Sequence, residues 1–143
     1  MFELSRRYVE EIIAHAREAA PNECCGILAG KGGRILKLYR AVNAEESPYR
    51  YSIDAQDLYR IYHEVESAGW DFLAIYHSHP SGEASPSVTD VGLATWTGPA
   101  GSVDLWPNTR YLIASLADAD SPVIRAFLIH GGRVTEEALR IAG

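Results

Sequence analysis

An unbroken apolar run that leads directly into two histidines is the feature that most constrains how this chain can fold. Residues 72–76 read FLAIY, and such a run is typical of a central strand that is covered on both faces. His77 and His79 follow at positions i and i+2, so in an extended strand both imidazoles point to the same side. The sequence therefore predicts a buried strand that presents two imidazoles together at its end.

The elements expected around this strand come from apolar spacing and from capping residues. Helices are predicted over 6–19 with Ser5 as N-cap, over 55–68 with Asp54 as N-cap and Gly69 as the stop, and from Pro86 to about Thr97. Strands are predicted over 23–30, 34–42 (joined by a hairpin at 30–33), 49–53, 111–116 and 123–130, with a loop over 98–109 and a last short element over 133–139. This order predicts an α+β layer fold with a mixed sheet between helices.

Composition narrows the class of protein. The chain has 143 residues and a net charge of −6, which favours one domain (1–143) and disfavours a general nucleic-acid binder. No apolar run approaches the ~20 residues of a membrane span, and no signal-peptide pattern opens the chain. We therefore expect a cytoplasmic protein with no membrane partner. The adjacent Cys24 and Cys25 form no redox motif and are expected to be buried free thiols.

A candidate metal site follows the histidine pair. Ser87 and Asp90 form a Ser-x-x-Asp sequence, which alone would be a plain capping box at the start of a helix. Together with His77 and His79, however, it brings a carboxylate near two imidazoles at the edge of the sheet. Two imidazoles and one carboxylate are the ligands of a catalytic zinc, with the fourth position left for water. We therefore predict one catalytic zinc ion, bound by His77, His79 and Asp90.

A zinc hydrolase also needs a general base outside the metal's ligands. Glu23, at the start of the strand that follows Pro21, is our candidate, although spacing alone leaves this choice open. Glu83 lies in the turn and is expected to be solvated. Asp71 precedes the central strand, at the end opposite the histidines.

These residues also match a known family. The pattern Glu…His-Ser-His-Pro-x7-Ser-x-x-Asp resembles that of the JAMM (MPN-plus) metalloproteases, in particular their short prokaryotic JAB-domain members. The segment Pro21–Gly30 (PNECCGILAG) resembles a second signature of the family. The resemblance extends from residue 2 to about 131 and implies the MPN/JAB fold, in which a curved mixed sheet lies between helices with a layering like that of cytidine deaminases.

The resemblance implies roles for the matched residues. His77, His79 and Asp90 would bind zinc, Glu23 would act as the acid and base that activates water, and Ser87 would donate a hydrogen bond to the tetrahedral intermediate. Members of the family cut amide or isopeptide bonds after the C-terminal Gly-Gly of ubiquitin-like proteins, or release an amino acid from a sulfur-carrier protein. The remaining histidines match no motif position and are expected to be solvated: His15, His63 and His130.

Other interpretations stay open at this point. A RadC-like protein shares Pro80-Ser81-Gly82, and peptidoglycan or phage-tail peptidases contain related domains. A non-catalytic binding module with a structural zinc would normally have four protein ligands, whereas the motif supplies three. A nucleobase deaminase would need His-x-Glu and Pro-Cys-x-x-Cys, which the sequence lacks. Trp106 is expected to be a partly buried packing residue, and self-association through the strand over 34–42 is left undecided.

Overall fold

A six-stranded mixed sheet forms the centre of the computed structural model, which describes residues 1–99 and 101–143. The strand order is β3-β2-β4-β7-β8-β9; β4 and β7 are parallel, and the other neighbours are antiparallel. The strands are β2 (Cys25–Lys31), β3 (Arg34–Ala41), β4 (Asp71–His79), β7 (Arg110–Ser115), β8 (Val123–His130) and β9 (Arg133–Glu137). The predicted central strand is therefore β4, which pairs on both sides.

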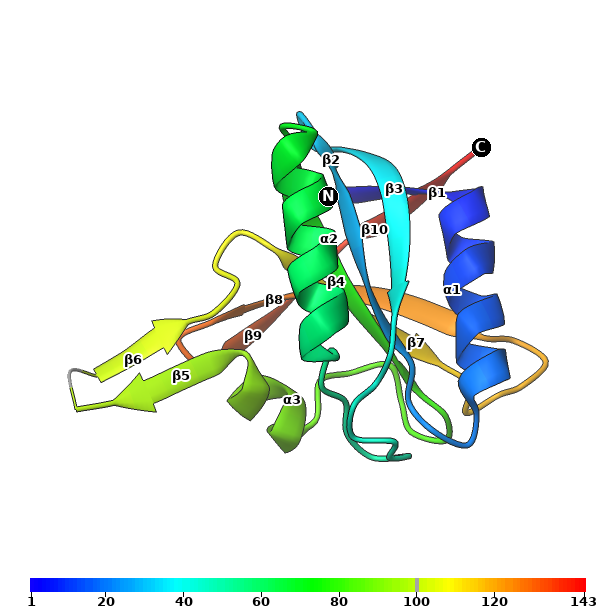
Figure 1. The fold of residues 1–143 in the computed structure, drawn as a ribbon. Coiled ribbons are helices and arrows are strands. Elements are labelled where there is room, and N and C mark those ends of the chain that lie inside the picture. Colours follow the sequence, from blue (N-terminus) through cyan, green and yellow to red (C-terminus); the bar gives the residue numbers. More distant parts are fainter. Residues whose placement is uncertain (100) are drawn as a thin grey trace.

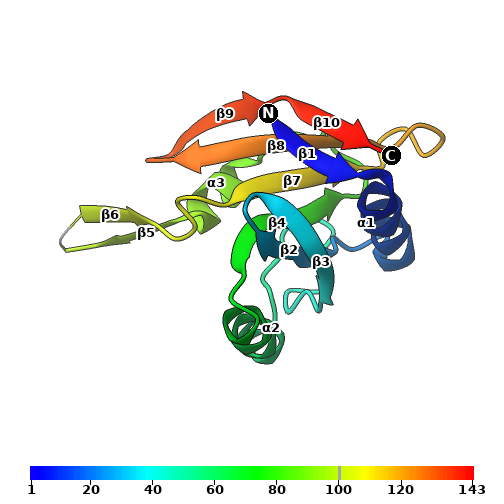
Figure 2. The ribbon, with the colours of Figure 1, turned by 90° about the horizontal axis from the view of Figure 1, so that it is seen from above.

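Both faces of this sheet are covered, as Figures 1 and 2 show. One face packs against α1 (Arg6–Ala19) and against a short parallel pair formed by β1 (Phe2–Ser5) and β10 (Leu139–Ala142). The other face packs against α2 (Ala55–Ser67) and the region of α3 (Val88–Leu93). Side chains alternate along β4, so Tyr76 lies in the α1 core while Ile75 lies in the α2 core. His77 consequently faces the side of α2 and α3.

Several local predictions are confirmed. Helix α1 has the predicted bounds, although the Ser5 side chain makes no capping hydrogen bond. Asp54 caps α2, because its side chain accepts a hydrogen bond from the Asp57 amide at 3.1 Å. The hairpin between β2 and β3 turns at Gly32 and Gly33, whose φ angles of 62° and 76° favour glycine.

Other local predictions are wrong. Residues 49–53 form no strand; only a single bridge joins Asn43 and Ile53. Helix α3 ends at Leu93 rather than near Thr97, because most of the last residues predicted as helix form β5 (Thr95–Gly98). This strand pairs with β6 (Gly101–Asp104), which lies in the region predicted as loop. Threonine and tryptophan favour strands over helices, which accounts for the switch. Strands β1 and β10 were not predicted, and the single element predicted over 133–139 is divided between β9 and β10.

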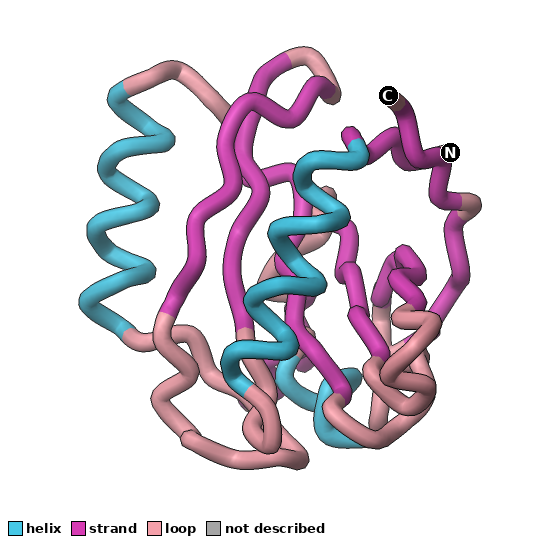
Figure 3. The backbone as a smooth tube through the Cα atoms, turned by 90° about the vertical axis from the view of Figure 1, so that its right-hand side faces the viewer, coloured by secondary structure: helices cyan, strands magenta, loops and turns pink. Residues whose placement is uncertain are grey.

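The connections that matter for the site gather at one end of the molecule (Figure 3). This end holds the segment before β2, the 42–54 loop after β3 and the turn after β4. The β5–β6 hairpin projects away from the body of the fold (Figure 1). None of the helices in the described ranges combines the length and the apolar character needed to cross a membrane.

Candidate metal centre

The antiparallel pairing of β2 with β4 brings distant residues to one end of the sheet. Cys25 is paired with His77, so the residues before Cys25 lie beside the residues after His77. The Ser78 amide donates to the Cys24 carbonyl at 3.2 Å, and the Cys24 amide donates to the Ser78 hydroxyl at 2.8 Å. These bonds extend the pairing by one residue. As a result Glu23 reaches the histidine pair.

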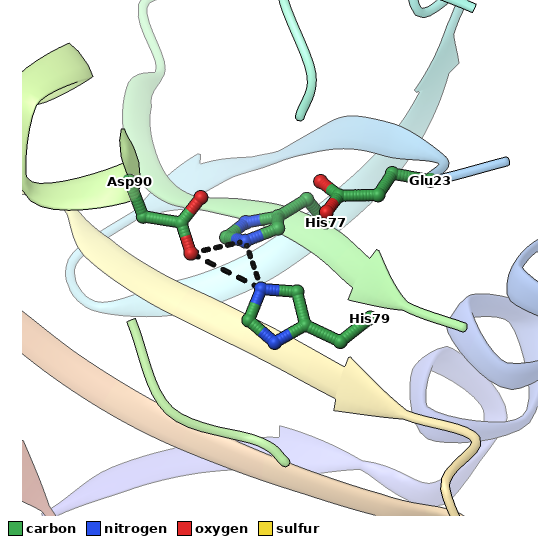
Figure 4. Close-up of side chains that lie close together, drawn as sticks. All are labelled: Glu23, His77, His79 and Asp90. Atoms are coloured by element: carbon green, nitrogen blue, oxygen red, sulfur yellow. Dashed lines mark hydrogen bonds and ion pairs between the residues drawn. The ribbon is translucent and has the colours of Figure 1, made fainter. Parts of the chain in front are cut away.

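The two histidines lie side by side with Asp90, as the i, i+2 spacing predicts (Figure 4). Their Nε2 atoms are 3.2 Å apart, and each is 3.1 Å from Oδ2 of Asp90. All three side chains are buried. Three atoms with lone pairs therefore converge on one point in the interior.

Asp90 owes its position to the start of α3. Its Oδ2 atom accepts a hydrogen bond from the Ser87 amide at 2.9 Å, while the Ser87 hydroxyl accepts one from the Asp90 amide at 3.0 Å. The predicted capping box is therefore confirmed. The oxygen that caps the helix is also the oxygen that faces both imidazoles, so capping and convergence occur together.

The electrostatics of this trio depend on burial and on mutual hydrogen bonds. Burial alone would raise the pKa of Asp90, but hydrogen bonds with His77 and His79 outweigh it and hold the pKa well below its usual range. Burial lowers the pKa of His77. Burial would also lower the pKa of His79, but the hydrogen bonds with Asp90 and with the Glu83 carbonyl, together with the nearby carboxylates, raise it overall. Asp90 is therefore a carboxylate, the form that binds metal ions.

Glu23 lies beside the trio from the other side of the imidazoles (Figure 4). Only 3% of the residue is exposed, and burial raises the pKa of its carboxyl group from 4.5 to about 7. One ligand atom from each of Glu23, His77, His79 and Asp90 lies within 4.8 Å of the others. A buried carboxyl group that titrates near neutral pH is suited to exchanging protons.

The arrangement fits a bound metal ion. In a tetrahedral site with bonds of about 2.0–2.1 Å, neighbouring ligand atoms are about 3.3 Å apart, and the observed separations are 3.1–3.2 Å. Within residues 1–99 and 101–143, Oε1 of Glu23 and Oδ1 of Asp90 are buried without a hydrogen-bond partner. Such groups are rare in folded proteins unless a ligand satisfies them. His77, His79 and Asp90 could hold the ion, and Glu23 could act next to it.

Contacts behind the two imidazoles fix their orientation. Nδ1 of His79 lies 2.6 Å from the Glu83 carbonyl oxygen, the kind of bond that directs Nε2 toward a metal. His77 is held differently: the Tyr51 ring stacks on it with centroids 4.3 Å apart and an angle of 19°. Tyr51 was not predicted as a site residue, because nothing in the sequence around a single loop tyrosine indicates which side chain it will cover.

A hollow of about 240 Å³ lies beside Tyr51. It is mostly apolar, and Tyr51, Ile75, Leu93 and Trp106 are among its lining residues. Trp106 is half-buried and lies 5.5 Å from Phe72 between ring centroids, as expected for a packing residue. Tyr51 both lines the hollow and stacks on His77, whereas Glu23, His77, His79 and Asp90 are not among the residues that line it.

Most other candidate residues lie where the sequence analysis expected them. Cys24 and Cys25 are buried free thiols, and burial raises their pKa values to about 11 and 12. Glu83 and Asp71 have exposed side chains, as do His63 and His130. The prediction for His15 is wrong: it is half-buried, and its Nδ1 lies 2.7 Å from the hydroxyl of Tyr76 across the α1 interface.

Comparison with known proteins identifies similar sequences. A family model described as prokaryotic homologues of the JAB domain matches residues 5–130. A CysO-cysteine peptidase of Mycobacterium tuberculosis is 36% identical over 135 residues, which cover 93% of this chain and 86% of that protein. A desampylase of Haloferax volcanii is 38% identical over 96 residues, which cover 62% of this chain and 69% of that protein.

Two solved structures are similar in fold. A protein of Desulfitobacterium hafniense superposes with a TM-score of 0.83 at 35% identity, covering 99% of this chain and 93% of the other. A JAB1/MPN-domain protein of Archaeoglobus fulgidus superposes with a TM-score of 0.62 at 19% identity and covers all of both chains. At 19% identity, the similarity to the Archaeoglobus fulgidus protein concerns the fold alone.

Proposed function

Because the chain belongs to the family of prokaryotic homologues of the JAB domain, we propose that it is a zinc-dependent peptidase. It hydrolyses the amide or isopeptide bond after the C-terminal Gly-Gly of a ubiquitin-like or sulfur-carrier protein, with residues 1–143 acting as one domain. The observation that carries this proposal is the buried cluster of Glu23, His77, His79 and Asp90, whose ligand atoms lie within 4.8 Å of one another. Three of them are zinc ligands in type, and the fourth is an acid.

The proposed mechanism assigns each residue a separate task. His77, His79 and Asp90 hold the ion, which when bound supplies Lewis acidity and lowers the pKa of water. Glu23 removes a proton from the attacking water and later delivers it to the leaving amine. The Ser87 hydroxyl accepts its hydrogen bond from the Asp90 amide, so its own proton remains available for the oxyanion of the substrate.

The substrate class is supported by the names of the similar proteins. The similar proteins include one named CysO-cysteine peptidase and one named desampylase. An extended tail that ends in two small glycines could bring its last peptide bond close to a buried metal ion. The leaving group is then either a free amino acid or the lysine of a protein.

The test is a cleavage assay on the source organism's own ubiquitin-like and sulfur-carrier proteins, each fused through Gly-Gly to a reporter or an amino acid. Zinc-loaded protein should release the group after Gly-Gly, whereas chelated protein should not. The Glu23→Gln variant should bind zinc stoichiometrically and lose about 10²–10⁴-fold in kcat, the usual contribution of a general base. Full activity in that variant would contradict the assignment of Glu23. Intact fusions with zinc bound would rule out this substrate class and direct attention to peptidoglycan peptides.

A further inference from the structure

The side chain of Asn43, just after β3, makes four hydrogen bonds, all of them to main-chain groups. Its Nδ2 donates to the Glu23 carbonyl at 3.0 Å and to the Arg50 carbonyl at 3.1 Å. Its Oδ1 accepts from the amides of Glu45 and Ser52, both at 3.0 Å. A primary amide has two donors and two lone pairs, so this side chain is fully used. Of the donor half, one bond reaches Glu23 and the other stays within the loop at Arg50; the acceptor half stays within the loop.

The donor half joins the loop to the residue proposed as general base. The Glu23 amide donates to the Ser47 carbonyl at 2.8 Å, and the Glu23 carbonyl accepts from Asn43. Both main-chain groups of Glu23 are therefore held by the 43–52 loop. The next amide, that of Cys24, is held from β4 by Ser78. The carboxyl group of Glu23 thus extends from a main chain that is fixed on both sides.

The same loop also fixes one of the proposed zinc ligands. Tyr51 lies between Arg50 and Ser52, both bonded to Asn43, and it stacks on His77. In the part of the chain that the structure describes, Nδ1 of His77 is buried without a hydrogen-bond partner. The orientation of the His77 ring therefore depends on stacking, whereas that of the His79 ring depends on a hydrogen bond.

From these contacts we infer that Asn43 is a positioning residue, which sets Glu23 at a fixed place relative to the Tyr51–His77 pair. The inference rests on the proposed function, because it gives Asn43 a role in the proton transfer assigned to Glu23. The hydrogen bonds of Asn43 all go to main-chain groups and none goes to the side chain of a proposed zinc ligand. It acts through the Glu23 main chain and through the loop that carries Tyr51.

Closing the loop does not require the donor half. Main-chain bonds already join its base, from the Ala44 amide to the Ser52 carbonyl at 2.8 Å and from the Asp54 amide to the Val42 carbonyl at 2.9 Å. A variant that loses only the donors should therefore fold with its loop closed. Its defect would appear in the placement of Glu23.

Two substitutions separate the halves. Asn43→Asp keeps an acceptor oxygen for the loop amides but sets a second, charged oxygen against the Glu23 and Arg50 carbonyls, while Asn43→Ala loses both halves. We expect Asn43→Asp to lower kcat at least tenfold, with KM and the zinc dissociation constant changed less than threefold, because misplacing a reacting group costs rate more than binding. Asn43→Ala should show the same loss of kcat and also weaken zinc binding by about tenfold. Asn108→Asp, the same change at an exposed turn residue, should leave all three constants unchanged.

Amide hydrogen exchange tests the same inference without activity. Both Asn43 variants should exchange the Glu23 and Cys24 amides at least tenfold faster than the wild type, with the melting temperature as a check on folding. Wild-type kcat in Asn43→Asp, or unchanged exchange at both amides, would overturn the positioning role. If the wild type and Glu23→Gln are equally inactive on every fusion, the proposed function fails, and the exchange rates alone decide the role of Asn43.

Discussion

At the scale of single residues, Glu23 has two properties that oppose each other. Burial makes its charged form costly and raises its pKa to about 7, while a general base must be charged to accept a proton. A bound cation beside it would favour the carboxylate, so the acidic limb of the activity profile should lie below pH 7 in zinc-loaded protein. A carboxyl group poised in this range can both take up and release a proton.

The raised pKa of Glu23 predicts how the stability of metal-free protein depends on pH. The unfolded chain loses this proton near pH 4.5 and the folded protein near pH 7, so between these values the free energy of unfolding falls as pH rises. Above pH 7 the free energy of unfolding has decreased by the full amount, about 3 kcal/mol. Glu23→Gln removes this dependence. In denaturant titrations the variant should gain about 3 kcal/mol over the wild type between pH 4.5 and pH 8.

The difference between the unfolding free energies of the two proteins at each pH cancels the titration of groups common to both, apart from those in contact with Glu23. A difference that stays constant across this range would contradict the raised pKa. Below pH 4.5 both states hold the proton, so the difference should no longer change.

At the scale of elements, α3 has one function in the fold and another in the proposed site. Its first turn is stabilised by Ser87 and Asp90, and the same turn directs the Asp90 carboxylate to the histidines. A six-residue helix has little stability of its own. The cap therefore determines whether the third proposed ligand is in place.

Replacing the cap should affect stability and metal binding together. Ser87→Ala removes the acceptor of the Asp90 amide and should cost about 1 kcal/mol of unfolding free energy. It should also weaken zinc binding about tenfold, because Asp90 loses its support. Denaturant titration and competitive zinc titration measure the two effects. Ser85→Ala, in the exposed turn before the helix, is the control, and equal effects in both variants would contradict a specific role for the cap.

How much the sequence predicted depends on how local each interaction is. The two histidines, Ser87 and Asp90 are joined by strand periodicity and a capping box, which can be read within 14 residues. Glu23 could not be chosen from spacing alone, because it reaches His79 only through the register of β2 on β4. The contact of His15 with Tyr76 is likewise tertiary.

The loop after β3 shows most clearly which structure could not be predicted from the sequence. Its shape comes from bonds between the Asn43 side chain and main-chain groups, which leave no periodic signal in the sequence. A strand was therefore predicted where the structure has only one bridge. The β5–β6 hairpin was missed because the apolar and capping pattern of α3 continued into strand-forming residues.

At the scale of the whole molecule, the proposed ligands link metal binding to folding. His77 and His79 belong to the central strand and Asp90 to a helix on one face of the sheet, so the complete set exists only in the folded chain. A ligand that binds only the folded state raises the free energy of unfolding by about 2.7 kcal/mol at one hundred times its dissociation constant.

Zinc should therefore raise the melting temperature of the wild type in a concentration-dependent way, and a chelator should reverse the increase. His77→Ala should show no such increase. His63→Ala, which changes an exposed histidine on α2, should respond like the wild type. A zinc-dependent increase that persists in His77→Ala would place the ion elsewhere.

The pairing of Cys25 in β2 with His77 in β4 has a further consequence for a chain that is still being synthesised. The segment with Glu23 leaves the ribosome long before the segment with the histidines, and until β4 docks beside β2 the acid has no partner. A nascent or broken copy that lacks β4 can therefore cut nothing, because the proposed activity appears only when two stretches of polypeptide made at different times have met.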